Sequence, residues 1–451
     1  MSTDWSMGTP QATREWGQVF AQESGSAPRL RKKWSTTQGI SYGAVLLFSI
    51  VYFARPEDWI PGANDIPVAK IAGSVALGTF LLSLLGRAKL NLPRGVLLLL
   101  ALFGQLCLAI PFSTWRGGSF DLVMYEFSKI VLIVLLLVQA VDTFPRLRQL
   151  IFVQTAAVIT IAVVSLINKT QIAGRMNGSI GGIFGNPNDL AASISLVMPF
   201  CFAFLLETRN IVKKGVWLCT ILLLIYALVA TLSRGGFLAL LAATAGSLWY
   251  VGAKARRCRR LILVLPFAMC FTLLGAMHGN YGTRIQSILD PTLDQNGSYA
   301  ERQGLLIRSL ELAATHPLFG VGPGMFGDAR NSGGWKAAHN SYTELAAEAG
   351  ILASVFFIWM FVDCFARVAR ISVNRVCDPD IRIFAGALSA SLVAFFVVAF
   401  VSSIEYLILP YFLMGYGTVL VSISLRIRRR RASEAGHGSR VMRQEHQPCV
   451  G

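Results

Sequence analysis

The chain has 451 residues, of which 54% are hydrophobic and 14% charged, and its formal net charge is +17. A water-soluble globular protein of this size does not tolerate so apolar a composition, so we expect a membrane protein. The basic residues stand in short runs between long apolar stretches, a pattern typical of membrane topology signals and not of a nucleic-acid-binding surface.

The first 38 residues are polar and end in a basic cluster formed by Arg29, Arg31, Lys32 and Lys33. No small-residue cleavage site precedes the first apolar run. Residues 1–38 are therefore predicted to be a cytosolic tail, followed by an uncleaved membrane helix.

About twelve apolar segments are long enough to cross a bilayer, which needs about 20 residues for each helix. They predict an all-α polytopic membrane protein, with transmembrane helices 1–9 in residues 39–277 and helices 10–12 in residues 350–426. The fourth segment carries the weakest signal. The segments are 39–54, 67–86, 94–111, 124–141, 147–167, 188–206, 214–232, 235–252, 260–277, 350–367, 382–404 and 408–426.

Lys and Arg are distributed unevenly between alternate connections. If the N-terminus is cytoplasmic, most of the 41 basic residues fall on the cytoplasmic side, as the positive-inside rule requires. Both termini are therefore predicted to be cytoplasmic, with residues 427–451 as a basic tail beside anionic lipid. The longest outer connection is 278–349.

The sequence gives little support to metal or disulfide chemistry. Five of the eight cysteines lie in apolar segments and none lies in 278–350, so we expect no disulfide and no cysteine metal site. Glu57 and Asp58 form a tight acidic pair in a short outer loop, but without neighbouring histidines they indicate an interfacial cap more than a metal site. We predict neither a metal nor a cofactor.

Two capping-box patterns predict helices inside the 278–349 loop. Ser298 with Glu301, and Ser341 with Glu344, each place a carboxylate three residues after a hydroxyl. The first helix should run from Tyr299 to Thr315 and the second from Tyr342 into Gly350. The glycine-rich segment 320–324 between them should allow a sharp backbone bend.

His339 and Arg302 stand near the starts of these two helices. His339 precedes the presumed cap Ser341, where the helix dipole disfavours imidazolium, so its ring should be neutral and able to accept a proton. The alternative is a solvated or structural loop histidine. Arg302 lies in a first turn, where a cation needs an anionic partner: a loop carboxylate such as Glu301 or Asp294, or a phosphate group.

Four further polar residues interrupt or border apolar segments. Arg234, in Thr-Leu-Ser-Arg-Gly-Gly, is either a functional residue or a side chain that snorkels to the outer headgroups. Arg175 is a weaker candidate of the same kind. Asn188 or Asp189 either caps the following helix or, for Asn188, contacts a sugar hydroxyl.

Four motifs together resemble the O-antigen ligase and polymerase superfamily. They are Phe184-Gly185-Asn186-Pro187-Asn188-Asp189-Leu190-Ala191, Thr231-Leu232-Ser233-Arg234-Gly235-Gly236, Arg302 followed by His316-Pro317-Leu318-Phe319-Gly320-Val321-Gly322-Pro323-Gly324, and His339-Asn340-Ser341-Tyr342 through Glu348-Ala349-Gly350. The similarity covers roughly residues 175 to 365, and no single motif decides it.

The resemblance implies a glycosyltransferase C-like fold in a bacterial inner membrane, with 278–349 as a periplasmic catalytic loop. It implies metal-independent, inverting transfer of a glycan from a polyprenyl (undecaprenyl) diphosphate to a hydroxyl on a lipid or polysaccharide acceptor. The catalytic histidine maps onto His339, and donor diphosphate binding onto Arg234 and Arg302, to which we add Arg175. Substrate binding is assigned to Asn188, Asn340 and Glu344. No nucleic acid partner is expected.

Four functions remain open. A ligase and a repeat-unit polymerase share this chemistry, and the sequence does not separate them. A protein-targeted oligosaccharyltransferase is disfavoured because no appended acceptor-recognition domain is visible. A transporter would suit about twelve helices, but its ionisable groups would be expected near the membrane midplane, whereas here the conspicuous polar residues lie toward the outer surface.

Overall fold

The computed structural model describes residues 36–54, 68–85, 92–169, 171–172, 174–178, 185–252, 298–327, 336–374 and 377–445. The predicted membrane segment 260–277, the pair Glu57 and Asp58, and Asp294 lie outside them. Within the described ranges the chain is mostly helical. The strands there are two residues long, β1 (Gln171–Ile172) and β2 (Arg175–Met176), and pair antiparallel.

The N-terminal half contributes α2 (Thr36–Ala54), α4 (Val68–Leu85), α5 (Arg94–Ala109), η1 (Ile110–Phe112), α6 (Arg116–Phe120), η2 (Asp121–Phe127), α7 (Ser128–Ala140) and α8 (Phe144–Ile167). The C-terminal half contributes α9 (Pro187–Glu207), α10 (Ile211–Ala230), α11 (Arg234–Ser247), η4 (Leu248–Gly252), α14 (Ser298–Thr315), α15 (Ser341–Ala349), α16 (Ile351–Val373), α17 (Pro379–Val401) and α18 (Ile408–Glu445).

In the described ranges, seven helices are long and apolar enough to cross a membrane, which makes the protein multi-pass. Helices also occupy the predicted segments 39–54, 67–86, 124–141 and 235–252. The count of about twelve spans stays a prediction. The seven are Arg94–Phe112, Phe144–Ile167, Pro187–Glu207, Ile211–Ala230, Ile351–Val373, Pro379–Val401 and Ile408–Arg429.

Small residues allow α9, α11 and α17 to pack closely at the centre. A Cβ on Gly236 of α11 would lie 2.4 Å from the Cβ of Ala191 on α9, and a Cβ on Gly246 would lie 3.1 Å from Ala390 on α17. Ser195 Oγ also donates to the Gly236 carbonyl over 3.0 Å. Close backbone approach is the usual way in which membrane helices gain packing energy, and here it fixes where α11 begins.

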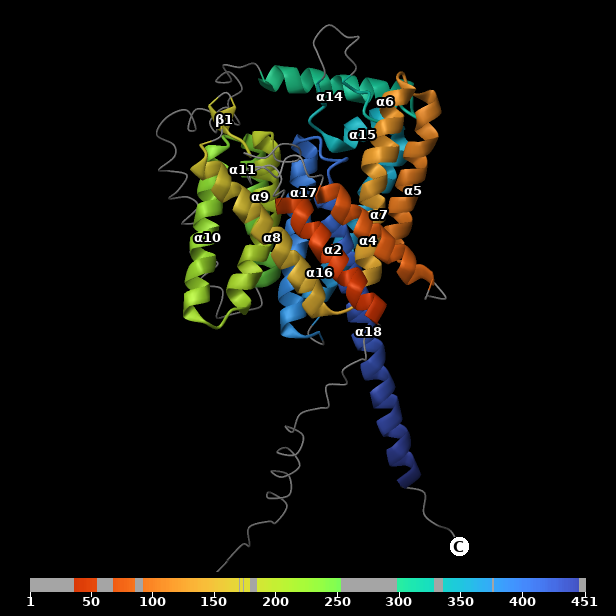
Figure 1. Cartoon of the computed structure of the whole chain (residues 1–451), viewed down its shortest axis with the longest axis vertical. Coiled ribbons are helices and arrows are strands. Elements are labelled where there is room, and N and C mark those ends of the chain that lie inside the picture. Colours follow the sequence, from red (N-terminus) through yellow and green to blue (C-terminus); the bar gives the residue numbers. More distant parts are fainter. Residues whose placement is uncertain are drawn as a thin grey trace, which may run out of the picture.

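The two ends of the helix assembly differ (Figure 1). Helix α14 lies across one end, which we call the α14 end, and α18 protrudes from the opposite end. Helix α18 continues to Glu445, well past the predicted boundary at 426. The Arg-, Ala- and Ser-containing tail has no proline before Pro448 to stop the helix.

The glycine-rich segment 320–324 bends sharply, as predicted. Gly320, Gly322 and Gly324 have φ of +64°, +114° and +75°, and a Cβ on Gly322 would lie 2.0 Å from Ser113 Oγ. Gly322 N–H donates to the Glu348 carbonyl over 2.8 Å. Because side chains would clash here and rarely adopt such φ values, only glycine lets this turn pack against both α15 and the η1 end.

Candidate functional site

His339 lies in the short segment before α15 and is held by its backbone. Its φ is +56°, an uncommon value for a residue with a side chain. Its N–H donates to Ser403 Oγ over 3.0 Å, which ties it to the connection between α17 and α18. A half-buried histidine held in a strained backbone conformation is a feature that functional sites often show.

The surroundings of His339 favour its neutral form. Burial lowers the pKa of the imidazole, the positive charge of Arg302 lowers it further, and Glu301 acts in the opposite direction. The sequence predicted a neutral ring, but from the helix dipole; burial and Arg302 are the causes that act here.

The cap of α15 differs from the prediction. Asn340, not Ser341, is the N-cap residue: its Oδ1 accepts from the backbone N–H groups of Tyr342 (3.1 Å) and Thr343 (3.2 Å). The Ser341 hydroxyl instead donates to the Ser402 carbonyl and accepts from Ile404 N–H, both over 2.8 Å. The prediction of a serine cap was wrong because tertiary partners engage that hydroxyl.

Glu344 also departs from the capping-box pattern. Its Oε2 accepts the backbone N–H of Ala338 over 2.9 Å and the hydroxyl of Ser403. Ser403 therefore bridges Glu344 and the His339 backbone. Since Ala338 and His339 are both held in this way, the Glu344–Ser403 pair fixes the backbone from which the histidine ring projects.

Arg175, Asn188 and the start of α11 form a second group. Arg175 donates through Nε to the Thr231 carbonyl (3.0 Å) and through Nη2 to Asn188 Oδ1 (2.7 Å). Ser233 Oγ donates to the same Asn188 oxygen over 2.9 Å. Ser233 is the N-cap of α11, so Arg234 is the first residue of that helix. Asn188 thus links the two arginine-bearing segments.

The cap of α9 was also predicted wrongly. Asn186, not Asn188 or Asp189, is its N-cap, and Asn186 Oδ1 accepts Asn188 N–H over 2.9 Å. The proline that follows Asn186 suits the first position of a helix, which places the cap two residues earlier than predicted. The Asn188 side chain is therefore available to bind Arg175.

Both groups lie at the α14 end and adjoin the C-terminus of α17. A Cβ on Gly235 would lie 2.8 Å from Val401 Cγ2, so the start of α11 packs against the last residue of α17. The next residues, Ser402 and Ser403, contact the α15 side as described above. Figure 1 shows α14 running from the side of α11 and β1 toward α6, across this region.

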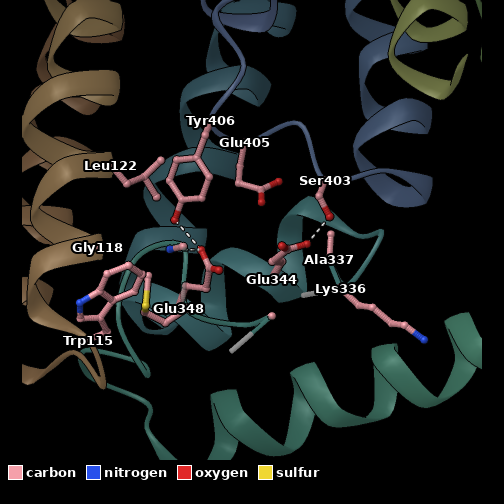
Figure 2. A pocket seen from close by; sticks show the side chains of 13 residues that line it. Trp115, Gly118, Leu122, Lys336, Ala337, Glu344, Glu348, Ser403, Glu405 and Tyr406 are labelled. Carbon is pink, nitrogen blue, oxygen red and sulfur yellow. Dashed lines mark hydrogen bonds between the residues drawn. The ribbon is translucent and has the colours of Figure 1, made fainter. Parts of the chain in front are cut away.

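A cavity of about 430 Å³ is lined in part by Ser403 (Figure 2), whose Oγ accepts the N–H of His339. Its walls come from α6 and η2, the glycine-rich turn, the segment before α15, α15 itself and the connection between α17 and α18. Glu344 is the one predicted site residue among its lining. The lining residues are Trp115, Gly118, Leu122, Gly324, Met325, Gly327, Lys336, Ala337, Glu344, Glu348, Ser403, Glu405 and Tyr406.

Three carboxyl groups face this cavity. Glu348 accepts through Oε2 from Gly324 N–H (2.8 Å) and Tyr406 OH (2.7 Å), and through Oε1 from Phe326 N–H (3.0 Å). Glu405 is 2% exposed, and its Oε2 has no hydrogen-bond partner in the described part of the chain. Burial raises the pKa of all three groups, and the negative charge of Glu348 raises the pKa of Glu344 further.

The sequence analysis missed Ser403, Glu405 and Tyr406. A usable signal was present, because the polar run 402–406 separates two long apolar segments, and an acidic residue between membrane helices is a functional candidate. Trp115 lies in a short predicted outer connection, and no motif around it in the sequence indicated a role in a site. Across the ranges that the structure describes, no group of three His, Cys, Asp or Glu side chains could hold a metal ion.

The fold and site define a multi-pass helical membrane protein that brings a half-buried histidine, arginines and a carboxyl-lined cavity to one end of its helices. Residues 219–358 match the family model described as O-antigen ligase, which confirms the resemblance to that superfamily over this part of the chain. Members of the family are membrane glycosyltransferase-like enzymes that act on lipid-linked glycans. No curated protein matches the chain significantly.

The matched region extends from within α10 to within α16 and includes Arg234, Arg302, His339, Asn340 and Glu344. Arg175, Asn188 and Glu405 lie outside it.

Proposed function

We propose that the protein is an O-antigen ligase-like glycosyltransferase. It transfers a glycan from a polyprenyl (undecaprenyl) diphosphate carrier to a hydroxyl on a lipid or polysaccharide acceptor. The reaction is inverting, needs no metal and serves cell-surface polysaccharide biosynthesis. The observation that carries this proposal is His339 inside the matched domain, in surroundings where burial and the charge of Arg302 lower the pKa of its ring.

His339 acts as the general base. Its neutral ring accepts the proton of the acceptor hydroxyl as the acceptor oxygen bonds to the anomeric carbon of the donor sugar. The bond between that carbon and the phosphate oxygen breaks on the opposite face, so the configuration inverts and the polyprenyl diphosphate leaves. A positioned base contributes about 10² to 10⁴ in rate.

The arginines stabilise the negative charge that develops on the leaving diphosphate. Arg302 and Arg234 bind it from α14 and α11, and Arg175 contributes from β2, held by Asn188 and Thr231. Guanidinium suits this role because it offers paired donors to phosphate oxygens.

Arg302 has a second effect on the base. In the absence of donor its charge lowers the His339 pKa. A bound diphosphate offsets that charge, so the pKa rises and the ring becomes a stronger base when the donor is in place. Base strength is thereby coupled to donor binding.

We propose that the α14 end faces the periplasm from the bacterial inner membrane, with both termini in the cytoplasm. The support comes from the basic residues, because most of the 41 Lys and Arg residues lie in the tails and alternate connections that this orientation assigns to the cytoplasm. The polyprenyl chain then lies between helices while its diphosphate reaches the arginines.

Transfer is tested with the purified protein in lipid, a defined polyprenyl diphosphate-linked glycan and a set of acceptors. Carrier release and product length are followed together. Release with one glycan added to a foreign acceptor indicates a ligase, whereas a growing ladder on the carrier indicates the polymerase of the same superfamily. No release by folded protein with any acceptor would contradict the proposal and favour a transporter.

Matched pairs of variants test the proposed roles of His339 as the base and Arg302 as a ligand of the diphosphate. His339→Ala should abolish transfer, while His437→Ala, at the opposite end of the molecule on α18, should retain it. Arg302→Lys should lose most activity because paired donors are lost, while the same change at Arg308 on the same helix should not. Wild-type transfer rates in His339→Ala would exclude it as the base.

A further inference from the structure

The cavity combines an aromatic platform with carboxyl groups. Trp115 is 59% exposed, and its indole ring lies over Gly118, where a Cβ would come within 2.6 Å of the ring. The missing side chain at Gly118 therefore sets the position of the ring. Figure 2 shows Trp115 at one side of the cavity and the carboxyls of Glu344, Glu348 and Glu405 beyond it.

One carboxyl oxygen of Glu405 has no hydrogen-bond partner in the described part of the chain. Glu348 is satisfied by three donors and Glu344 by two, but Glu405 Oε2 is buried without a hydrogen bond among the described residues. Figure 2 shows its carboxyl facing the space between Glu344 and Glu348. A buried carboxyl oxygen left without a partner is costly, and a ligand hydroxyl or amine in the cavity would remove this cost.

The charge of the lining selects among ligands. Lys336 is the one cation among the residues that line the cavity, and its Nζ is paired with Glu301 on α14 over 2.5 Å. Figure 2 shows this side chain directed away from the carboxyls. An acidic sugar would bury its carboxylate without a cationic partner, whereas sugar hydroxyls and amines can hydrogen-bond to the carboxyl groups.

The position of the cavity separates it from the arginines. Ser403 Oγ touches both its lining residue Glu344 and the His339 backbone, so the cavity adjoins the base. Its far wall is α6 and η2, whereas Arg234 and Arg175 lie at the start of α11 and on β2. A sugar in the cavity would thus approach the segment that carries His339 from the side of α6 and η2.

We propose that this cavity is the subsite for the terminal acceptor sugar, an inference that rests on the glycosyltransferase function proposed above. Trp115 stacks on the pyranose ring, and Glu405 and Glu344 bind its hydroxyls. The subsite selects sugars without an acidic group. The volume of about 430 Å³ falls within the range of about 300–1,000 Å³ that small-molecule sites occupy. Glu405 is then a specificity residue for the acceptor.

The first test measures binding and needs no turnover. Full-length protein in nanodiscs is examined by saturation-transfer NMR with methyl hexopyranosides of gluco and galacto configuration, each as the neutral, 2-amino and uronic acid form. Neutral or amino glycosides should bind, the uronic acids should not, and Glu405→Gln or Trp115→Ala should remove the signal. Binding of the uronic acids equal to the others, no binding of any probe, or binding unchanged in both variants would overturn the proposal.

The second test separates acceptor from donor. In the transfer assay, Glu405→Gln should raise the acceptor KM about 10-fold and leave the donor KM unchanged. Glu126→Gln, an exposed charge change on η2, is the matched control and should behave as wild type. A rise in donor KM alone would overturn the acceptor assignment. Absence of transfer by the wild type would instead refute the proposed function, while the binding test still decides whether the cavity holds a sugar.

Discussion

Glu348 offers a quantitative test of how the site is held together. Its buried carboxyl accepts two backbone N–H groups, from Gly324 and Phe326, and the hydroxyl of Tyr406. Each buried donor left without a partner costs about 1–3 kcal/mol, so Glu348→Ala should destabilise this region by about 3 kcal/mol or more. Glu348→Gln should cost about 1–3 kcal/mol, because its NH₂ group must face at least one backbone N–H.

Hydrogen exchange of individual amides measures this locally. In Glu348→Gln, exchange at Gly324 or Phe326 should accelerate about 5- to 150-fold, the rate equivalent of about 1–3 kcal/mol. Val321 N–H, which donates to the Ala347 carbonyl over 2.9 Å, does not depend on the Glu348 side chain and is the internal control. Unchanged exchange at both reporter amides in folded Glu348→Ala would refute the assignment of these hydrogen bonds.

Three further predictions concern pH and packing. Arg302→Gln should raise the His339 pKa, so the acid limb of the kcat/KM profile should move to higher pH, and a limb that stays in place would contradict the electrostatic link. Burial and Glu348 raise the Glu344 pKa from its ordinary 4.5 to about 8, so the stability that its proton contributes is full below about pH 4.5 and lost as pH rises through about 8. Glu344→Gln should therefore flatten the pH dependence of thermal inactivation between pH 5 and 8. Gly322→Ala should lower the unfolding temperature sharply because its Cβ overlaps a serine hydroxyl, whereas Gly304→Ala, with open space around it in α14, should stabilise the helix by about 0.5–1 kcal/mol.

Several features of the protein were determined by local sequence. Long apolar runs dictate membrane helices, because the bilayer requires every backbone polar group to be bonded within the segment. The two capping-box patterns and the helix breakers after them also predicted α14 and α15 nearly to the residue, and the glycines of 320–324 predicted the bend. Resemblance of four short motifs pointed to the family that residues 219–358 match.

Tertiary structure decided what each polar side chain does. The sequence predicted Ser341 and Asn188 as caps, but both side chains bond to partners distant in sequence. Ser341 bonds to the backbone of Ser402 and Ile404. Asn188 accepts hydrogen bonds from Arg175 and Ser233. The capping preferences of Ser and Asn are worth about 1 kcal/mol, and a buried long-range hydrogen bond competes with them on equal terms. Local pattern cannot rank such alternatives.

The cavity could not be predicted from the sequence either, because it too depends on contacts between distant parts of the chain. Trp115 lies more than 200 residues before Glu344, and Glu405 follows Glu344 only on the far side of two membrane helices, α16 and α17. None of the three carries a local signature of sugar binding. Only the packing of the glycine turn, α15 and the connection after α17 brings them together. Burial in that packed region, which depends on the whole fold, also sets the pKa values of His339 and the carboxyls.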